Sequence, residues 1–271
     1  MPRHRGKYNP ENETPYEISR SQIESFLKCP ACFWMNRVKG IKFPGMPGFL
    51  LNTATDTLLK KDFDVYRELE QPHPFMVSQG LDDLVPFKHE DFELWTKSLQ
   101  LGFRTDYEQC NFIVGGGLDD VWQNTKTGEL HIVDYKSTAS AKNTEGTALK
   151  EITLDGNYKQ AYKRQMDMYV WILRRKGFEV SNKGYFVYVN GDQHFENGML
   201  VDNKSKAKMM FDVQLIEYES DDRWVEETIK SVKACLDSSS CPGHSQIGFG
   251  PKGDKPCEVS VLLDGIKDNN L

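Results

Sequence analysis

Two runs of sequence decide the fold expected for this chain: Gly117-Leu118-Asp119-Asp120-Val121-Trp122 and Leu130-His131-Ile132-Val133-Asp134-Tyr135-Lys136. The segment between them, residues 124–129, has the composition of a hairpin loop, and Gly128 can take the positive φ that such a loop needs. The two runs are therefore expected to pair as antiparallel strands.

The register of this hairpin places two acidic residues face to face. If Asn124 and Glu129 close the loop as partners, the same register puts Asp119 directly opposite Asp134. Directly opposed residues point to one face of a sheet with Cβ atoms about 4.5–5.5 Å apart, so these carboxylates repel unless something neutralises them. A divalent cation is the natural partner, because hard cations prefer oxygen ligands.

The period of two along a strand adds a lysine to this face. Lys136 lies on the same side as Asp134, whereas Tyr135 faces the other way. Two carboxylates and a lysine suit metal-assisted phosphodiester hydrolysis: the cation would polarise the scissile phosphate, and Lys136 would orient the attacking water or stabilise the developing charge. The alternative is an ordinary hairpin with a surface ion pair between Asp119 and Lys136, which would contribute little.

The segment from Asn157 to Gly177 has the apolar periodicity of a helix, with Gly177 as its expected end. Gln165 interrupts the apolar stripe. Because a buried amide costs free energy unless its polar atoms are paired, we expect Gln165 to bond to a group on the sheet. A capped or water-bonded core glutamine is the alternative.

Together these motifs resemble a known family. Gly-x-Asp at 117–119, Asp-x-Lys at 134–136 and Gln-x-x-x-Tyr at 165–169 are similar to the motifs of the PD-(D/E)XK nuclease superfamily, in its RecB-like branch. Residues 21–30, ending in Cys-Pro, resemble the opening helix of that branch, and the resemblance extends over roughly residues 20–240. It implies an α/β fold with a mixed central β-sheet flanked by helices, in a restriction-endonuclease-like core.

The resemblance also implies a role for each motif residue. Asp119, Asp134 and the peptide carbonyl of Tyr135 would hold Mg²⁺ or Mn²⁺, Lys136 would be the catalytic lysine, and Gln165 and Tyr169 would form the helix motif. One feature departs from the branch, which usually carries a metal-binding histidine on its first core helix, because residues 52–59 contain none. Asp56 occupies the expected position and could supply an oxygen ligand or be a solvated helix residue.

The chain also has six cysteines, which are more often metal ligands or free thiols than disulfides in a cytosolic protein. The resemblance implies a four-iron, four-sulfur cluster that joins the two ends of the chain, held by Cys29, Cys235, Cys241 and Cys257. A zinc site from Cys235, Cys241, His244 and Cys257 is a second possibility, and no bound metal is a third. Cys29 and Cys32 also have ligand-like spacing, although Cys32 could simply be packed.

Charge gives two indications about nucleic acid. The net charge of −6 argues against a protein that coats DNA broadly. The helix after the hairpin is nevertheless basic, and its cations could contact phosphates: Lys159, Lys163, Arg164, Arg174 and Arg175. A second basic group lies near the N-terminus. For both groups, the alternative is that the basic side chains only form a solvated face of the protein and do not contact phosphates.

Length and hydropathy indicate one catalytic core with short ends. At 271 residues the chain can bury a full core, and no apolar run approaches the roughly 20 residues that a membrane span needs. We expect a basic N-terminal arm at 1–19, the nuclease domain at 20–240 and a cysteine-containing tail at 241–271 that packs on the core. We also expect a cytoplasmic location without membrane contact.

The expected helices and strands follow the order that such a core requires. A capping box of Ser21 and Glu24 would begin the first helix, and further helices are expected at 50–69, 89–100 and 222–236. Strands are expected at 112–114, 119–123, 129–137, 184–190 and 211–218.

These expectations together describe a divalent-metal-dependent DNA nuclease, and the resemblance implies an exonuclease that acts on single strands or duplex ends. The leading alternative is a DNA-binding or assembly subunit that keeps the fold, uses its cysteines structurally and does not cleave. A sequence-specific restriction-type endonuclease would need a base-reading element that we do not identify in the sequence.

Overall fold

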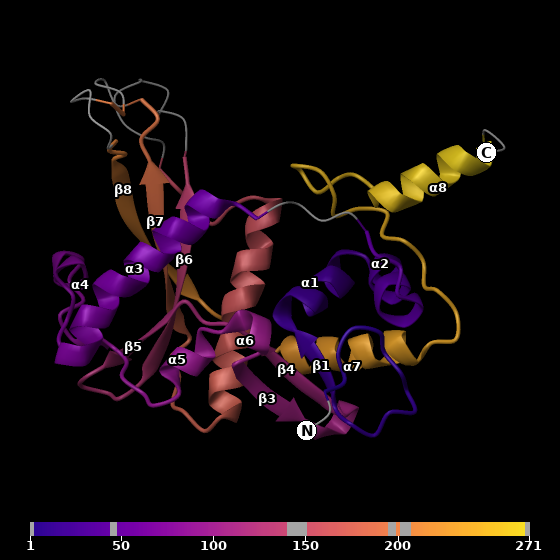
Figure 1. Ribbon diagram of the computed structural model, residues 1–271, viewed down its shortest axis with the longest axis horizontal. Helices are drawn as coiled ribbons and strands as arrows, with labels where there is room; N and C mark the ends of the chain where they lie inside the picture. Colours follow the sequence, from indigo (N-terminus) through magenta and orange to yellow (C-terminus); the bar gives the residue numbers. More distant parts are fainter. Residues whose placement is uncertain (1–2, 44–47, 140–150, 195–198, 201–206, 269–271) are drawn as a thin grey trace.

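The computed structural model describes residues 3–43, 48–139, 151–194, 199–200 and 207–268. It has a mixed α/β architecture with two β-sheets and helices packed against them (Figure 1). The general class expected from the sequence is therefore confirmed, but the strands form two sheets instead of one central sheet.

The larger sheet carries the hairpin and has the strand order β2-β5-β6-β7-β8. The bounds are Leu84–Pro86 for β2, Asp120–Asn124 for β5, Leu130–Thr138 for β6, Lys183–Gly191 for β7 and Phe211–Glu219 for β8. β6 and β7 run parallel, whereas the other neighbours are antiparallel. A parallel pair needs a crossover connection, and a helix supplies it here.

The predicted hairpin is confirmed in position and register. The Asn124 N–H donates to the Glu129 carbonyl at 2.9 Å, and Gly128 has a φ of 80°. Asp120 pairs with Val133, which is the expected register. A local turn and strand alternation therefore sufficed to predict which residues of β5 and β6 face each other.

The smaller sheet has the order β1-β4-β3, with bounds Tyr16–Ser19 for β1, Phe103–Tyr107 for β3 and Phe112–Gly116 for β4. We expected β4 in the central sheet, and this is wrong because β1 and β3 pair with its two edges. Part of the segment expected as a basic N-terminal arm, residues 1–19, belongs to this sheet, since Tyr16 and Ile18 are buried in β1. Both Arg3 and Arg5 pair with Glu17, so both side chains are engaged within the domain and one of their two charges is compensated there.

Three helices lie where the sequence placed them: α3 at Leu50–Leu69, α6 at Gln160–Arg175 and α7 at Val225–Asp237. Gly177 follows α6 with a φ of 91°, as expected for its end. The remaining helices are α1 (Arg20–Lys28), α2 (Pro30–Trp34), α4 (Pro74–Ser78), α5 (Phe92–Trp95) and α8 (Glu258–Asp268), with a π turn at Met35–Lys39 and 3₁₀ turns at Ser98–Gln100, Glu108–Cys110 and Asn157–Lys159.

Two helix predictions are corrected. The capping box of α1 joins Ser19 and Gln22 instead of the predicted pair two residues later, because the backbone is still extended at Ser19 where β1 ends. The helix expected at 89–100 shortens to α5. The Trp95 carbonyl accepts the Leu118 N–H at 3.0 Å, so a neighbouring segment takes an acceptor that a longer helix would use.

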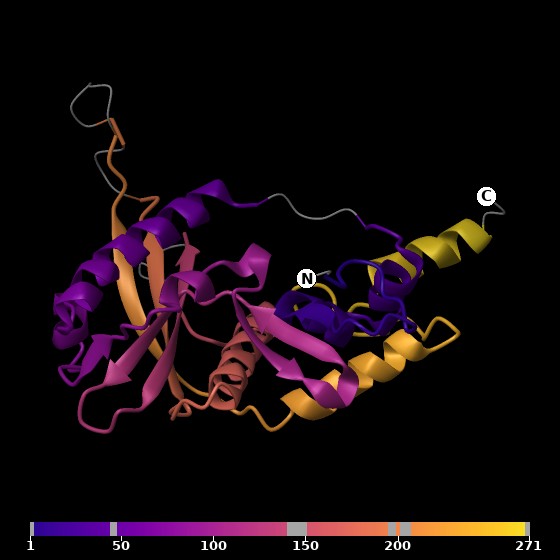
Figure 2. The same ribbon diagram turned by 60° about the horizontal axis from the view of Figure 1, so that its bottom comes forward.

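The two faces of the larger sheet have different covers. α3 packs against β2 and β6 on one face, whereas α6 lies on the other face, between the two sheets (Figure 2). Val133 and Tyr135 belong to the apolar cluster on the α3 side, and Leu130 and Ile132 to the larger cluster around α6, as strand alternation predicted. No helix in the described ranges is long and apolar enough to cross a bilayer.

Candidate metal centres

Asp134 lies in the middle of β6 and is buried, with 1% of its surface exposed. Gln165 of α6 donates from Nε2 to Asp134 Oδ1 at 2.7 Å, and Lys136 Nζ forms an ion pair with Asp134 Oδ2. The prediction that Gln165 bonds to the sheet is confirmed. Arg20, at the start of α1, donates to Gln165 Oε1 at 2.8 Å, which turns the amide nitrogen toward Asp134.

Asp119 lies just before β5 and approaches the same centre. Its Oδ2 accepts the Tyr135 N–H at 3.0 Å, which fixes the carboxylate beside β6. Lys60 of α3 donates to Asp119 Oδ1 at 3.3 Å and to Asp56 Oδ2 at 2.9 Å. We did not single out Lys60 from the sequence, although its spacing of four residues from Asp56 on a helix was an available signal.

We call the group formed by Asp56, Asp119 and Asp134 with Lys60, Lys136 and Gln165 the carboxylate centre. Its charged side chains shift one another's pKa values. Burial raises the pKa of Asp134 to about 7 despite the opposing effect of Lys136, and the charge of Asp119 adds to the rise. Burial, followed by the charge of Asp119, also raises the pKa of Asp56. Three acids share Lys60 and Lys136, so the centre keeps an excess of negative charge when all are ionised.

One oxygen of this centre is held by a cationic group. Asp134 Oδ2 is buried, and among the described residues its partner is the Lys136 ammonium, which forms an ion pair with it. A buried carboxylate oxygen is normally hydrogen-bonded or bound to a metal. Carboxylate oxygens are also the ligands that Mg²⁺ prefers. The residues present are therefore chemically suited to a divalent cation.

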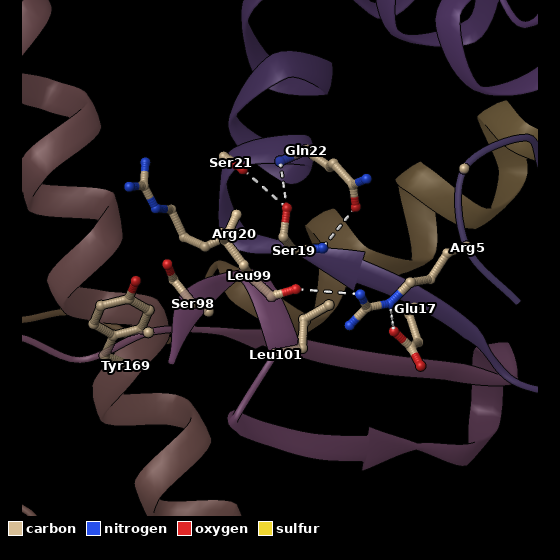
Figure 3. Close-up of a pocket in the computed structure, with 13 residues that line it drawn as sticks. Arg5, Glu17, Ser19, Arg20, Ser21, Gln22, Ser98, Leu99, Leu101 and Tyr169 are labelled. Atoms are coloured by element: carbon tan, nitrogen blue, oxygen red, sulfur yellow. Dashed lines mark hydrogen bonds and ion pairs between the residues drawn. The ribbon is translucent and has the colours of Figure 1, made fainter. Parts of the chain in front are cut away.

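Tyr169, the second residue of the helix motif, lies one turn of α6 beyond Gln165. Burial raises its pKa, and the Gly117 N–H donates to its oxygen. A Cβ at Gly116 would lie 2.8 Å from the Tyr169 ring, so this approach requires glycine. Figure 3 shows the Arg20 side chain extending from α1 toward α6, the helix that carries Tyr169, and both residues line a cavity of about 510 Å³.

The basic residues considered for DNA contact are mostly engaged within the protein. Lys163 alone among the five has no hydrogen-bond or ion-pair partner in the described part of the chain. The other four pair as follows: Arg164 with Glu24, Arg174 with Asp222, Arg175 with the Asp106 carbonyl, and the buried Lys159 with the Thr153 carbonyl.

A second centre, which we call the cysteine–histidine cluster, joins distant parts of the chain. The ligand atoms of Cys29, Cys32, His244 and Cys257 all lie within 4.8 Å of one another. Cys32 Sγ lies 3.4 Å from Cys257 Sγ, and the Cys29 and Cys32 sulfurs lie 3.5 and 3.7 Å from His244 Nδ1. Thiolates about 2.3 Å from a tetrahedral zinc ion stand about 3.7 Å apart, so these spacings suit a single ion.

Cys235 and Cys241, which we expected as ligands, lie outside this cluster. The Cys235 sulfur faces the Pro30 carbonyl at 3.9 Å, and the Cys241 sulfur faces the Ala31 carbonyl at 4.0 Å. Cys32 belongs to the cluster instead, because α2 begins directly after Cys29 and returns the chain to the same side three residues later. The Cys-x-x-Cys spacing was the signal for it.

The thiols of the cluster differ in acidity. Burial alone would raise the pKa of Cys29, but the N–H groups of Cys32 and Ser245 and the His244 side chain outweigh it and lower the pKa to about 6. Burial and the neighbouring sulfurs of Cys257 and Cys29 raise the pKa of Cys32. The protein thus stabilises one thiolate by itself, and a central cation would stabilise the others.

Comparison with known proteins adds no family to this picture. No protein-family model matches the chain, and no curated protein matches it significantly. Its function therefore has to be argued from the residues of the two centres.

Proposed function

We propose that this protein is a divalent-metal-dependent DNA nuclease of the PD-(D/E)XK type, in the RecB-like branch, and that it hydrolyses phosphodiesters as an exonuclease on single strands or duplex ends. The observation that carries the proposal is Asp134. It is a buried carboxylate that Lys136 and Gln165 contact on one face of the sheet, one at each oxygen. Asp119 lies close enough to raise its pKa.

Each residue of the carboxylate centre has a role in this proposal. Asp119 and Asp134 would hold Mg²⁺ or Mn²⁺, with Asp56 and the Tyr135 carbonyl as further oxygen ligands. The bound cation supplies Lewis-acid stabilisation of charge on the phosphate. The Lys136 ammonium, which lies 4.7 Å from the centre of the Tyr162 ring, would orient the attacking water or stabilise negative charge on the phosphate.

Two residues support this group without contacting the substrate. Gln165 fixes the orientation of the Asp134 carboxylate, and Arg20 fixes that of Gln165. Both are positioning residues in this proposal, because each acts through its neighbour.

A second candidate function, a non-cleaving DNA-binding or assembly subunit, is favoured by the lysines. Lys60 bridges Asp56 and Asp119, and Lys136 pairs with Asp134. Two cations thus already neutralise most of the negative charge of the three acids. A protein that used these residues only for its fold would have the same ion pairs.

Cleavage of labelled single-stranded DNA and blunt duplex DNA in Mg²⁺ or Mn²⁺ separates the two functions. Asp134→Asn should lower the rate at least about 10³-fold, because it removes a charged cation ligand from the transition-state environment. Asp62→Asn, a change at an exposed acid of α3, is the matched control and should cleave like the parent. A parent that binds DNA but cleaves neither substrate with either metal would favour the non-cleaving subunit.

We also propose that the cysteine–histidine cluster holds one zinc ion with a structural role. Four protein ligands with the spacings of a tetrahedral site leave no position for a reactant. In an iron–sulfur cubane each cysteine binds a different iron, so its ligands stand further apart than those of one ion. Metal analysis of anaerobically purified protein should find one zinc per chain, and iron with a visible absorption band would instead assign an iron–sulfur cluster.

A further inference from the structure

A second cavity, of about 270 Å³, opens next to Lys136. We call it the tyrosine pocket, since its lining includes Tyr158, Tyr162 and Tyr188 together with Lys136, Lys159 and Thr153. One wall is fixed by Gln214 of β8, whose side chain accepts the Ile152 N–H at 3.0 Å and donates to the Ile152 carbonyl at 2.8 Å. The wall of the pocket at Ile152 is therefore held in place by the fold.

The hydroxyl of Tyr188 is buried beside this pocket and has no hydrogen-bond partner among the described residues. Tyr188 is 3% exposed, and its hydroxyl makes no hydrogen bond within the described ranges. A phenylalanine would fill the same space, so the fold does not need this oxygen. Burial raises the pKa of Tyr188, so the hydroxyl keeps its proton and can donate it. Tyr188 lines the cavity, so this donor would gain a hydrogen bond if a ligand brought an acceptor within its reach.

The other side chains of the pocket offer aromatic faces and positive charge. Tyr158 is 64% exposed and meets Tyr162 edge to face, with ring centres 6.1 Å apart. Lys159 Nζ, which donates to the Thr153 carbonyl, lies 5.1 Å from the centre of the Tyr188 ring, and Lys136 Nζ lies 4.7 Å from the centre of the Tyr162 ring. Aromatic rings beside lysines are the combination that binds single-stranded nucleic acid, because bases stack on the rings and phosphates attract the cations.

Two acidic residues determine how a nucleotide would be oriented in the pocket. Glu151 and Asp155 also line it. A carboxylate repels a phosphate but accepts hydrogen bonds from the exocyclic amines of a base. A nucleotide would therefore turn its base toward Glu151 and Asp155 and its phosphate toward Lys136.

We propose that the tyrosine pocket binds one unpaired nucleotide of the substrate strand, with the base stacked on Tyr158, an acceptor on the base receiving the Tyr188 hydroxyl, and the phosphate at Lys136. The proposal rests on the nuclease function for its place beside the cleaved bond. The cavity has room for one base. A base that stacks on Tyr158 has left its neighbours in the strand, so the substrate would be single-stranded or frayed at this nucleotide.

The test measures binding in Ca²⁺ at fixed salt, with short single-stranded DNA that carries 2-aminopurine at successive positions. Tyr158→Ala should weaken binding about 5- to 100-fold and remove the quenching of one 2-aminopurine, whereas Tyr158→Phe should keep both. Tyr188→Phe should weaken binding about 3- to 10-fold, with a melting temperature equal to or above that of the parent. Tyr185→Phe, on the opposite face of β7, is the matched control and should not alter binding.

The outcomes separate this proposal from the nuclease function. Unchanged binding in Tyr158→Ala and Tyr188→Phe would overturn the pocket assignment even if the parent cleaves DNA. Tyrosine-dependent binding by a parent that does not cleave would keep the pocket and overturn the nuclease. A lower melting temperature in Tyr188→Phe would show that the hydroxyl serves the fold, and Tyr158→Ala, at an exposed position, would then decide the stacking role alone.

Discussion

At the scale of single residues, two neighbouring acids have opposite surroundings. Asp120 is 0% exposed and accepts hydrogen bonds from Arg67 at 2.6 Å and from the Tyr135 hydroxyl at 2.6 Å. The Asp119 side chain is 21% exposed, and its partners are Lys60 and a backbone N–H. Asp120 is therefore committed to the fold, whereas Asp119 keeps access for a ligand.

This difference predicts two separate phenotypes. Asp120→Ala should lower the free energy of unfolding by about 3–5 kcal/mol, because it removes the buried partner of Arg67 and leaves that cation only the half-exposed Asp64. Asp119→Ala should change it by less than about 1 kcal/mol but abolish metal-dependent cleavage. Urea unfolding and a cleavage assay on both variants check this. Equal loss of stability in the two variants would contradict the assignment.

At the scale of elements, α6 connects the carboxylate centre to the rest of the domain. Two residues beyond Gln165, Asp167 is 4% exposed and accepts from the Trp224 indole, the Tyr218 hydroxyl and the Asp221 N–H at 3.0–3.1 Å. These donors belong to β8 and to the segment before α7. Asp167 thus ties α6 to both neighbours and holds the helix that positions Gln165.

Removal of the Asp167 carboxylate should destabilise the packing of α6 against its neighbours. Asp167→Ala should lower the free energy of unfolding by about 2–4 kcal/mol, because three donors lose their partner. Burial, with the charge of Asp221 in support, raises the pKa of Asp167 above 3.8. The folded state therefore binds the proton more tightly than the unfolded state, and this group lowers stability as pH rises from about 4 through its folded pKa. Asp167→Asn should remove that slope in pH-dependent urea unfolding.

At the scale of the whole molecule, the cysteine–histidine cluster joins α1 and α2 to the segment beyond α7. Cys29 and Cys32 come from the beginning of the chain and His244 and Cys257 from its last part. Cys257 is 1% exposed, whereas α8 after it buries none of its described residues. A bound ion would close a loop over most of the sequence, which limits the freedom of the unfolded chain.

Loss of this link should therefore appear in metal content and stability together. Cys29→Ala should lose the bound metal and lower the melting temperature by about 5–15 °C, comparable to the loss of a long-range cross-link. Cys110→Ala is the matched control, because Cys110 is buried outside the cluster. Cys235→Ala distinguishes the ligand sets: it should keep the metal, and loss of metal in this variant would restore Cys235 as a ligand.

The sequence by itself predicted the features that depend on local geometry. Gly128 and strand alternation predicted the hairpin register, and the helix expected at 50–69 has the bounds of α3. The same periodicity placed Gln165 on the buried side of α6, where it needed a partner on the sheet. These features follow from turn chemistry and from the periods of strands and helices, which a few neighbouring residues determine.

Tertiary structure alone decided the features that depend on distant contacts. The separation of β4 into a second sheet, the position of Lys60 between two acids and the inclusion of Cys32 in the metal cluster all join residues far apart in the chain. The Tyr188 hydroxyl is a further case. Its lack of a hydrogen-bond partner among the described residues can be recognised only from the positions of its neighbours in the fold. Sequence periodicity says which side of an element is buried, but packing between elements decides what it is buried against.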